Sequence, residues 1–286
     1  MTTDSVTAPT RESVERDVRR ALEEDVGSGD VTADLLPAAA HARARVITRE
    51  AAVLCGTAWF DECFHQLDAR TRVEWHAKDG DRVVAGAVLC HLSGAARALV
   101  TGERTALNFL QTLSGTASAT ATYVDAARGT RTTVLDTRKT LPGLRAAQKY
   151  AVRVGGGKNH RIGLFDAVLI KENHIAAAGS IGAAIQRARA LHPDLLVETE
   201  VENFAELREA LAAGADRIML DEFELHELAQ AVAEVGGRVP LEVSGSVALE
   251  RVRAIAETGV DYVSIGALTK HVRAVDLSMR IELVDA

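Results

Sequence analysis

The sequence has little of what stabilises secreted or membrane-bound proteins. Its 286 residues include only three cysteines, Cys55, Cys63 and Cys90, which form no CxxC pair. An odd, scattered set of this kind favours a reducing setting over a disulfide framework. No apolar run approaches the ~20 residues of a membrane-spanning helix, and the polar start MTTDSVTAPTRESVERD lacks the apolar segment of a secretory signal. We therefore expect a cytoplasmic protein with no membrane partner.

The charge of the chain is acidic, but it is unevenly distributed. A formal net charge of −7 argues against general binding of nucleic acid. From Thr137 to Arg161, however, there is no acidic residue, while seven lysines and arginines and one histidine lie in that window. This concentration of cations predicts a binding site for a small anionic ligand.

The C-terminal half alternates short apolar runs with segments of helical periodicity such as FAELREALAAGA. This alternation predicts parallel strands joined by right-handed helical crossovers. An α/β barrel of TIM type is favoured over an open nucleotide-binding sheet, because no GxGxxG motif follows any strand. Six strands are predicted, at 132–137, 166–171, 195–201, 217–221, 241–244 and 262–266.

The N-terminal third has a different pattern. Periodicity predicts a helix at 11–25, followed by the strand-like pieces ARARVITRE, RVEWHAKDG and AGAVLCHLSG and by a second helix at 103–114 that continues through 115–127. We predict a smaller α/β domain at 1–114 and a barrel domain at 115–269, with the tail 270–286 packing on the first domain.

In an α/β barrel the active site lies at the carboxyl ends of the strands. Cations follow the first two predicted strands, acids follow the next two, and glycine turns follow the last two. In chain order these residues are Thr137, Arg138, Lys139, Lys171, Glu198, Thr199, Glu200, Asp221, Ser244, Gly245, Ser246, Gly266 and Ala267. Backbone N–H groups in such turns bind phosphate, although both glycines could also serve only as turn residues.

The charged residues also have simpler interpretations. A single lysine near a strand end is usually a solvated charge, but Lys171 ends the apolar run AVLI, where it should have a ligand or an acid beside it. Glu200 and Asp221 could form a general acid/base pair, share a Mg²⁺ ion, or pair with Lys139 and Lys171. A phosphate site beside them favours the metal.

Three further cations, Arg145, Lys149 and Arg153, repeat every four residues along GLRAAQKYAVRV. This spacing places them on one stripe of a helix. We interpret the stripe as a solvated or interface face rather than as catalytic residues.

The segment DTRKTLPGLRAAQKYAVRVGGGKNHRIGL, followed by DAVLIKENHI, strongly resembles the quinolinate phosphoribosyltransferases, also called carboxylating nicotinate-nucleotide pyrophosphorylases. Nearly the whole chain shares this resemblance, through EEDVGSGDVTADLLP, GERTALNFLQTLSGTA, LVETEVEN, IMLDEF, EVSGSV and TGVDYVSIGALT in the same order. It implies an N-terminal α/β sandwich and an incomplete, seven-stranded α/β barrel, and so one strand more than the six predicted above.

The resemblance implies a pentosyltransferase of NAD biosynthesis. Such an enzyme joins quinolinate to phosphoribosyl pyrophosphate with the help of Mg²⁺, and gives nicotinate mononucleotide, CO₂ and pyrophosphate. The resemblance also implies a homodimer, or a higher oligomer, with shared active sites.

Residue roles follow from the same resemblance. Those assigned to catalysis are Lys139, Glu200 and Asp221, the last two also to Mg²⁺. Those assigned to substrate are Thr137, Arg138, His160, Arg161 and Lys171, together with Arg104, which enters the neighbouring subunit's site. Those assigned to phosphate are Ser244, Gly245, Ser246, Ile265, Gly266 and Ala267. The family more often has glycine where this chain has Ser246.

Other functions stay open on the sequence alone. Lys171 could form a Schiff base in an aldolase-like lyase, and a phosphoribosyltransferase of the same fold could act on another aromatic acid. The piece DGDRVVAG resembles a biotinyl or lipoyl carrier hairpin, but no lysine lies at its tip. We interpret it as a local β motif.

Overall fold

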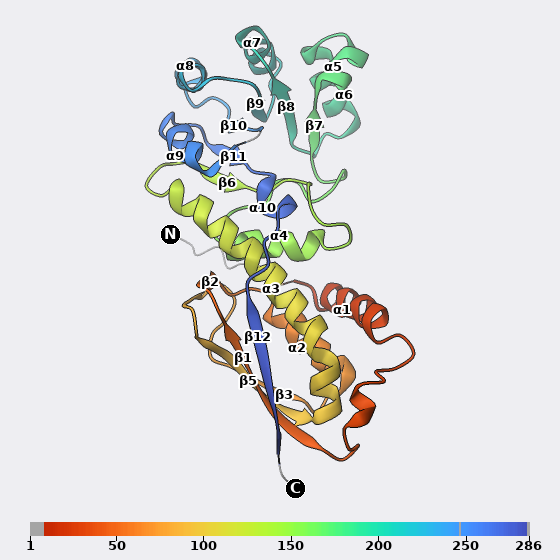
Figure 1. The fold of residues 1–286 in the computed structure, drawn as a ribbon. Coiled ribbons are helices and arrows are strands. Elements are labelled where there is room, and N and C mark those ends of the chain that lie inside the picture. Colours follow the sequence, from red (N-terminus) through yellow and green to blue (C-terminus); the bar gives the residue numbers. More distant parts are fainter. Residues whose placement is uncertain (1–8, 246, 285–286) are drawn as a thin grey trace. The chain divides into compact units, whose positions relative to one another are not determined.

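The structure, a computed structural model, describes residues 9–245 and 247–284. The chain divides into two compact units (Figure 1), and each is described by itself. Unit 1 comprises Met1–Ala121, Thr140–Gly156 and Thr269–Ala286, and unit 2 comprises Thr122–Lys139 and Gly157–Leu268. The limits 1–114 and 115–269 remain our sequence-based proposal for the domain boundaries.

Unit 1 is built on an antiparallel sheet with the strand order β12-β1-β5-β3. The strands are β1 (His41–Thr48), β3 (Arg72–Trp75), β5 (Val88–Ala95) and β12 (Leu277–Val284). Along β1 the residues alternate between exposed and buried, because successive side chains of a strand point to opposite faces. One face of the sheet is therefore apolar and needs a cover.

Helices provide that cover (Figure 1). The helices of unit 1 are α1 (Arg11–Val26), α2 (Thr57–Leu67), α3 (Ala96–Ala126) and α4 (Arg145–Val154), with a short 3₁₀ helix, η1, at Ala33–Leu35. Their buried side chains join those of the sheet in one core, which includes Trp59, Phe60 and Leu110. The predicted helices at 103–114 and 115–127 are thus one helix, α3. The carrier-like piece contributes β4 (Arg82–Val83), which pairs with β2 (Ala52–Val53) in a small sheet of its own.

The helix α4 belongs to unit 1, although both of its flanking segments belong to unit 2. Tyr150 donates a hydrogen bond to Asp79 Oδ2 at 2.8 Å, and Gln148 Nε2 donates one to the backbone oxygen of Thr269 at 2.9 Å. Lys149 is only 2% exposed, and Arg145 and Arg153 are half-buried. Of the two alternatives predicted for this stripe, the solvated face is wrong, because this face of α4 is packed; the interface alternative stays a prediction.

Unit 2 is built on a parallel sheet with the strand order β6-β11-β10-β9-β8-β7. The strands are β6 (Thr133–Leu135), β7 (Val168–Ile170), β8 (Val197–Val201), β9 (Arg217–Leu220), β10 (Leu241–Val243) and β11 (Tyr262–Ser264). Each lies within one of the six ranges predicted from the sequence, so that prediction is confirmed. The seventh strand implied by the resemblance is reduced, among the described residues, to a parallel bridge between Leu135 and Lys158.

Helices alternate with these strands along the chain (Figure 1): α5 (Glu172–Ala178), α6 (Ile181–Leu191), α7 (Phe204–Ala212), α8 (Leu225–Val235), α9 (Leu249–Glu257) and α10 (Ala267–Lys270). Polar caps begin two of them. Ser180 Oγ accepts the N–H of Ala183 at 3.1 Å, and Asn203 Oδ1 accepts the N–H of Glu206 at 3.0 Å. No helix in the described ranges is both long enough and apolar enough to cross a membrane.

Candidate active site

The loops predicted to form the site lie along one edge of the sheet in unit 2. All neighbouring strands there are parallel, so their carboxyl ends share that edge. From β6 to β7 the edge carries, in spatial order, the loops that begin at Asp136, Ile265, Ser244, Asp221, Glu202 and Lys171. The described site residues of the sequence prediction, apart from Arg104, therefore belong to one compact unit.

Two acids that border the cation-rich window shape its loops. Asp136 is fully buried, and its carboxylate accepts the N–H of His160 at 2.9 Å and Asn159 Nδ2 at 2.6 Å. The carboxylate of Asp166 accepts the N–H groups of Ile162 at 2.6 Å and Gly163 at 2.9 Å. Neither acid was predicted as a site residue. The feature that could have indicated them is their position at the borders of the cation-rich window.

Arg138 and Arg161, from the two ends of that window, lie within electrostatic range of each other. Burial lowers the pKa of Arg161 below its usual value, and the like charge of Arg138 lowers it further. Arg138 Nε is buried and has no hydrogen-bond partner among the described residues. Paired guanidinium groups with donors to spare fit an anionic ligand with more than one carboxylate.

His160 faces the interior of the sheet. Its Nε2 lies 2.9 Å from Glu198 Oε2 on β8 and 3.6 Å from Glu242 Oε1 on β10. Its Nδ1 accepts the backbone N–H of Arg161 at 2.7 Å. Burial lowers the pKa of His160, but the hydrogen bond to Glu198 and the charges of Glu242 and Glu198 outweigh it, so the pKa is raised. Nδ1 is therefore hydrogen-bonded within the protein, and Nε2 lies within ion-pair distance of two buried carboxylates.

The acids at the edge differ in their surroundings. Lys171 Nζ contacts Glu200 Oε2 directly, which confirms that this lysine has an acid beside it. Asp221 follows β9, and no lysine or arginine pairs with its carboxylate among the described residues. Of the two acids, Asp221 is thus the one that forms no salt bridge among the described residues.

The two turns predicted to bind phosphate each contain a glycine that lies close to polar side chains of neighbouring loops. Gly245 has φ +118°, a region that other residues rarely adopt, and a Cβ there would lie 3.5 Å from Asp221 Oδ1. A Cβ at Gly266 would lie 2.9 Å from Lys139 Cδ and 3.5 Å from Thr137 Oγ1. Glycine at 266 therefore leaves space for Lys139. Ser246 lies outside the described residues.

A pocket of about 220 Å³ lies at the ends of β9 and β10. Asp221, Ser244 and Gly245 line it, and Arg251 of α9 completes its wall with a further cation. The sequence analysis did not single out Arg251, since it is one of several arginines in a periodic helix. The pocket combines a carboxylate, a glycine turn and a cation, which are the groups that a phosphate with its metal requires.

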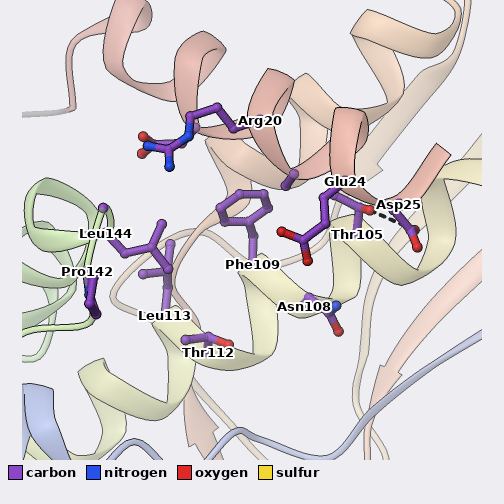
Figure 2. Close-up of a pocket in the computed structure, with 13 residues that line it drawn as sticks. Arg20, Glu24, Asp25, Thr105, Asn108, Phe109, Thr112, Leu113, Pro142 and Leu144 are labelled. Carbon is purple, nitrogen blue, oxygen red and sulfur yellow. Dashed lines mark hydrogen bonds between the residues drawn. The ribbon is translucent and has the colours of Figure 1, made fainter. Parts of the chain in front are cut away.

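Unit 1 has a pocket of a different character (Figure 2). It has a volume of about 330 Å³ and lies between α1, α3 and the turn before α4. Phe109 and Leu113 are part of its wall beside Glu24 and Asp25, and Thr105 Oγ1 donates a hydrogen bond to Asp25 Oδ2 at 3.0 Å. Carboxylates repel anionic substrates, so we do not place the predicted site there. Arg104, next to Thr105 on α3, is exposed.

The buried acids of unit 2 predict a pH-dependent stability. Burial, reinforced by Glu198, raises the pKa of Glu242 from 4.5 to about 7. A carboxyl group with a raised pKa stabilises the fold fully below pH ~4.5 and loses this contribution as the pH rises towards ~7. The raised pKa of His160 acts in the same direction. We expect the melting temperature to fall by about 5 °C between pH 5 and 8, and to fall less in Glu242→Gln.

Differential scanning fluorimetry across this pH range measures the effect. Glu234→Gln is the matched control, because Arg208 lowers the pKa of that half-buried glutamate. The stability that its carboxylate contributes therefore changes only below pH 5. An equal slope in the wild type and Glu242→Gln would contradict the prediction.

Comparison with known proteins agrees with this geometry. The family model for the C-terminal domain of quinolinate phosphoribosyl transferase matches residues 116–280, and the model for the N-terminal domain matches residues 30–114. The chain is 44% identical to the carboxylating nicotinate-nucleotide pyrophosphorylase of Mycobacterium leprae (strain TN), over 92% of this chain and 95% of that protein.

Solved structures agree as well. The nicotinate-nucleotide pyrophosphorylase from Francisella tularensis matches with a TM-score of 0.94 and 47% identity, over 98% of this chain and 100% of that one. The protein of the same name from Ehrlichia chaffeensis matches with a TM-score of 0.89 and 40% identity, over 93% of this chain and 98% of that one. With both domains matched in order, the chain belongs to the quinolinate phosphoribosyl transferase family.

Proposed function

We propose that the protein transfers the phosphoribosyl group of phosphoribosyl pyrophosphate to the ring nitrogen of quinolinate, as a step of NAD biosynthesis. The products are nicotinate mononucleotide, CO₂ and pyrophosphate. The observation that carries this proposal is the presence of Arg138 and Arg161, close enough for their like charges to interact, at the same sheet edge as Asp221 and the glycine turn at Gly245. A dicarboxylate and a phosphorylated sugar each find matching groups there.

The cations serve the dicarboxylate. Arg138 and Arg161 can each present two parallel N–H groups to a carboxylate, while Lys139 and Lys171 supply point charges and Thr137 a hydroxyl. The resemblance adds His160 to this set. Lys171 is paired with Glu200, and an ammonium group held by a carboxylate is not a nucleophile. This contact disfavours the Schiff-base lyase.

The other substrate, phosphoribosyl pyrophosphate, would lie at the glycine turns that follow β10 and β11. Backbone N–H groups around Ser244 and Gly245, and around Ile265, Gly266 and Ala267, suit its phosphates. The role that the resemblance gives Ser246 stays part of the proposal. Asp221 and Glu200 offer the hard oxygen ligands that Mg²⁺ prefers, directly or through water. When bound, Mg²⁺ would neutralise charge on the pyrophosphate.

The chemistry asks the protein mainly for positioning. As the bond from ribose C1 to pyrophosphate breaks, its electron pair leaves with pyrophosphate and positive charge develops on the ribose. The carboxylates of Glu200 and Asp221 can stabilise this charge or hold the ribose hydroxyls. The quinolinate nitrogen gives its lone pair to C1 and becomes cationic. Loss of the 2-carboxylate as CO₂ then leaves a carbanion beside that nitrogen, which takes up a proton.

The acceptor ring must lie in line with C1 and away from water for this sequence to run. A cation held too tightly against the departing carboxylate would favour the ground state over decarboxylation. Lys139, whose side chain packs against the backbone of Gly266, can supply a positive charge that orients the ring.

The decisive experiment is an assay of quinolinate with phosphoribosyl pyrophosphate, with and without Mg²⁺. Formation of nicotinate mononucleotide and CO₂ that depends on both substrates supports the proposal. Nicotinate is the control acceptor, because it lacks the second carboxylate. If nicotinate is used as well as quinolinate, the protein acts on another aromatic acid, and the assignment of the paired arginines fails.

We also propose that the enzyme is a cytoplasmic homodimer with shared active sites, to which Arg104 of one subunit contributes in the other. Arg104 is exposed on α3, outside the unit that carries the other site residues. In unit 2, Leu164 and Phe165 are each 74% exposed only a few residues beyond Arg161. Large apolar side chains exposed side by side are typical of a surface that another subunit covers.

Mixing two inactive variants tests this arrangement. Arg104→Ala and Lys139→Ala should each be nearly inactive alone. After the subunits are exchanged, half of the dimers carry one intact site of two, so we expect about a quarter of the wild-type activity. Mixing Lys139→Ala with Lys171→Ala is the control, because both residues lie in unit 2 and each heterodimer would lack an intact site. No recovery in the first mixture would contradict a shared site.

A further inference from the structure

A layer of polar side chains lies inside the parallel sheet of unit 2, below the proposed site. Four adjacent strands supply it, and their register sets Glu198 beside Arg217 and Glu242 beside Tyr262. Glu198 is 1% exposed and Glu242 is fully buried. Arg217 Nη1 lies 3.1 Å from Glu242 Oε2, and the guanidinium stacks 4.3 Å from the centre of the Tyr262 ring.

Burial of two carboxyl groups is costly unless each has a partner. Arg217 pairs with Glu242 at 3.1 Å. His160 Nε2 lies 2.9 Å from Glu198 Oε2, and neither oxygen of Glu198 has a hydrogen bond of good geometry among the described residues. His160, Glu198 and Glu242 also offer ligand atoms within 4.8 Å of one another, as a metal site would. A metal ion there would lie against the guanidinium of Arg217, which would repel it. The layer is therefore better explained as a set of contacts that holds the imidazole of His160 in place.

The other side of the imidazole reaches the substrate loop. A backbone N–H can donate only to a ring nitrogen that carries no proton, so the contact from Arg161 N to Nδ1 at 2.7 Å assigns the ring proton to Nε2. Glu198 Oε2 lies 2.9 Å from that nitrogen. Asp136 holds the same loop through the N–H of His160 and the amide of Asn159. The backbone just before the Arg161 side chain is thus fixed from two directions.

We propose that His160 is a positioning residue: Glu198 and Glu242 hold its imidazole, and its Nδ1 fixes the backbone of Arg161, so that the guanidinium of Arg161 meets quinolinate beside Arg138. Arg161 needs such support, because two guanidinium groups that approach each other repel when no anion lies between them. This inference rests on the proposed function, since it takes the bound dicarboxylate to be quinolinate. It gives His160 a different role from the substrate contact that the resemblance implies.

Two substitutions of His160 separate its two contacts. The amide of His160→Gln can still donate to Glu198 but loses the contact to Arg161. The carbonyl of His160→Asn can still accept from Arg161 but loses Glu198. If the histidine links the two, each change should raise KM for quinolinate about 10–100-fold, as losses of supporting contacts do. KM for phosphoribosyl pyrophosphate should stay within about twofold and kcat within about threefold.

A double-mutant cycle with Glu198→Gln decides between the two roles of His160. His160→Asn has already lost the link to Glu198, so adding Glu198→Gln should raise KM for quinolinate by no more than about threefold. The double variant should also regain thermal stability, because Glu198→Gln removes a buried charge that has lost its partner. Glu234→Gln, a matched loss of a carboxylate on α8, should leave KM for quinolinate unchanged.

Three results would overturn the inference. The effects of His160→Asn and Glu198→Gln on KM could multiply, kcat could fall while KM for quinolinate is unchanged, or both substrates could be weakened equally. Wild-type turnover, measured first, reports on the proposed function alone. A wild type that neither binds nor converts quinolinate would overturn the proposed function. Failure of the double-mutant cycle in an active enzyme would overturn only the positioning role of His160.

Discussion

Replacing Arg138 by alanine is expected to weaken quinolinate binding by about 10²–10³-fold, because loss of one partner from a desolvated charge pair leaves the other unpaired. Arg138 carries a buried Nε with no partner among the described residues, and its charge is close enough to lower the pKa of Arg161. In the proposed function both guanidinium groups bind the same dicarboxylate, and Arg161 alone would not hold both carboxylates in the geometry that sets the ring against ribose C1.

Isothermal calorimetry with each substrate separately measures this effect. Binding of phosphoribosyl pyrophosphate, whose phosphates we propose to lie at the turns after β10 and β11, should change by less than about threefold, since sites without shared partners behave independently. Arg187→Ala, on the exposed face of α6, is a matched loss of one guanidinium from the same unit. If Arg138→Ala weakens both ligands equally, the division of labour between loops and turns is wrong.

The gathering of these loops at one sheet edge could be predicted because it follows from local patterns. Short apolar runs such as AVLI and RIML sit between helices with clear periodicity, and parallel strands bring their carboxyl ends together whatever their order in space. Each predicted strand was found, and Lys171 has the acid that its position demanded. The strand positions followed from the periodicity of apolar residues, and the acid beside Lys171 followed from the free-energy cost of burying an unpaired charge.

The supporting residues could not be predicted in the same way. Glu242 lies in the middle of a strand, and nothing local shows that it faces His160 from a distant part of the chain. The packing of α4 in unit 1 was also missed, because a stripe of three cations looks solvated until the neighbours that bury Lys149 are known. Contacts between residues far apart in sequence decide such details, and periodicity carries no information about them.

Replacing Asp221 by asparagine is expected to raise the Mg²⁺ concentration needed for half-maximal activity at least about tenfold, since a neutral amide is a much weaker ligand for a hard cation. The two acids at the edge are not equivalent. Glu200 already contacts Lys171, whereas Asp221 forms no salt bridge in the described part of the chain and lies against the turn at Gly245. Titration of activity with Mg²⁺ at saturating substrates measures the shift.

Glu200→Gln is the matched change, and it separates metal binding from ribose stabilisation. Because Lys171 competes for its carboxylate, we expect this variant to lower kcat by about 10–100-fold with little change in the Mg²⁺ requirement, as loss of a group that acts in the transition state would. If Glu200→Gln and Asp221→Asn instead shift the Mg²⁺ requirement equally, both acids hold the ion. In that case Lys171 would have to release Glu200 when the ion binds, and Lys171→Met would then tighten Mg²⁺ binding rather than leave it unchanged.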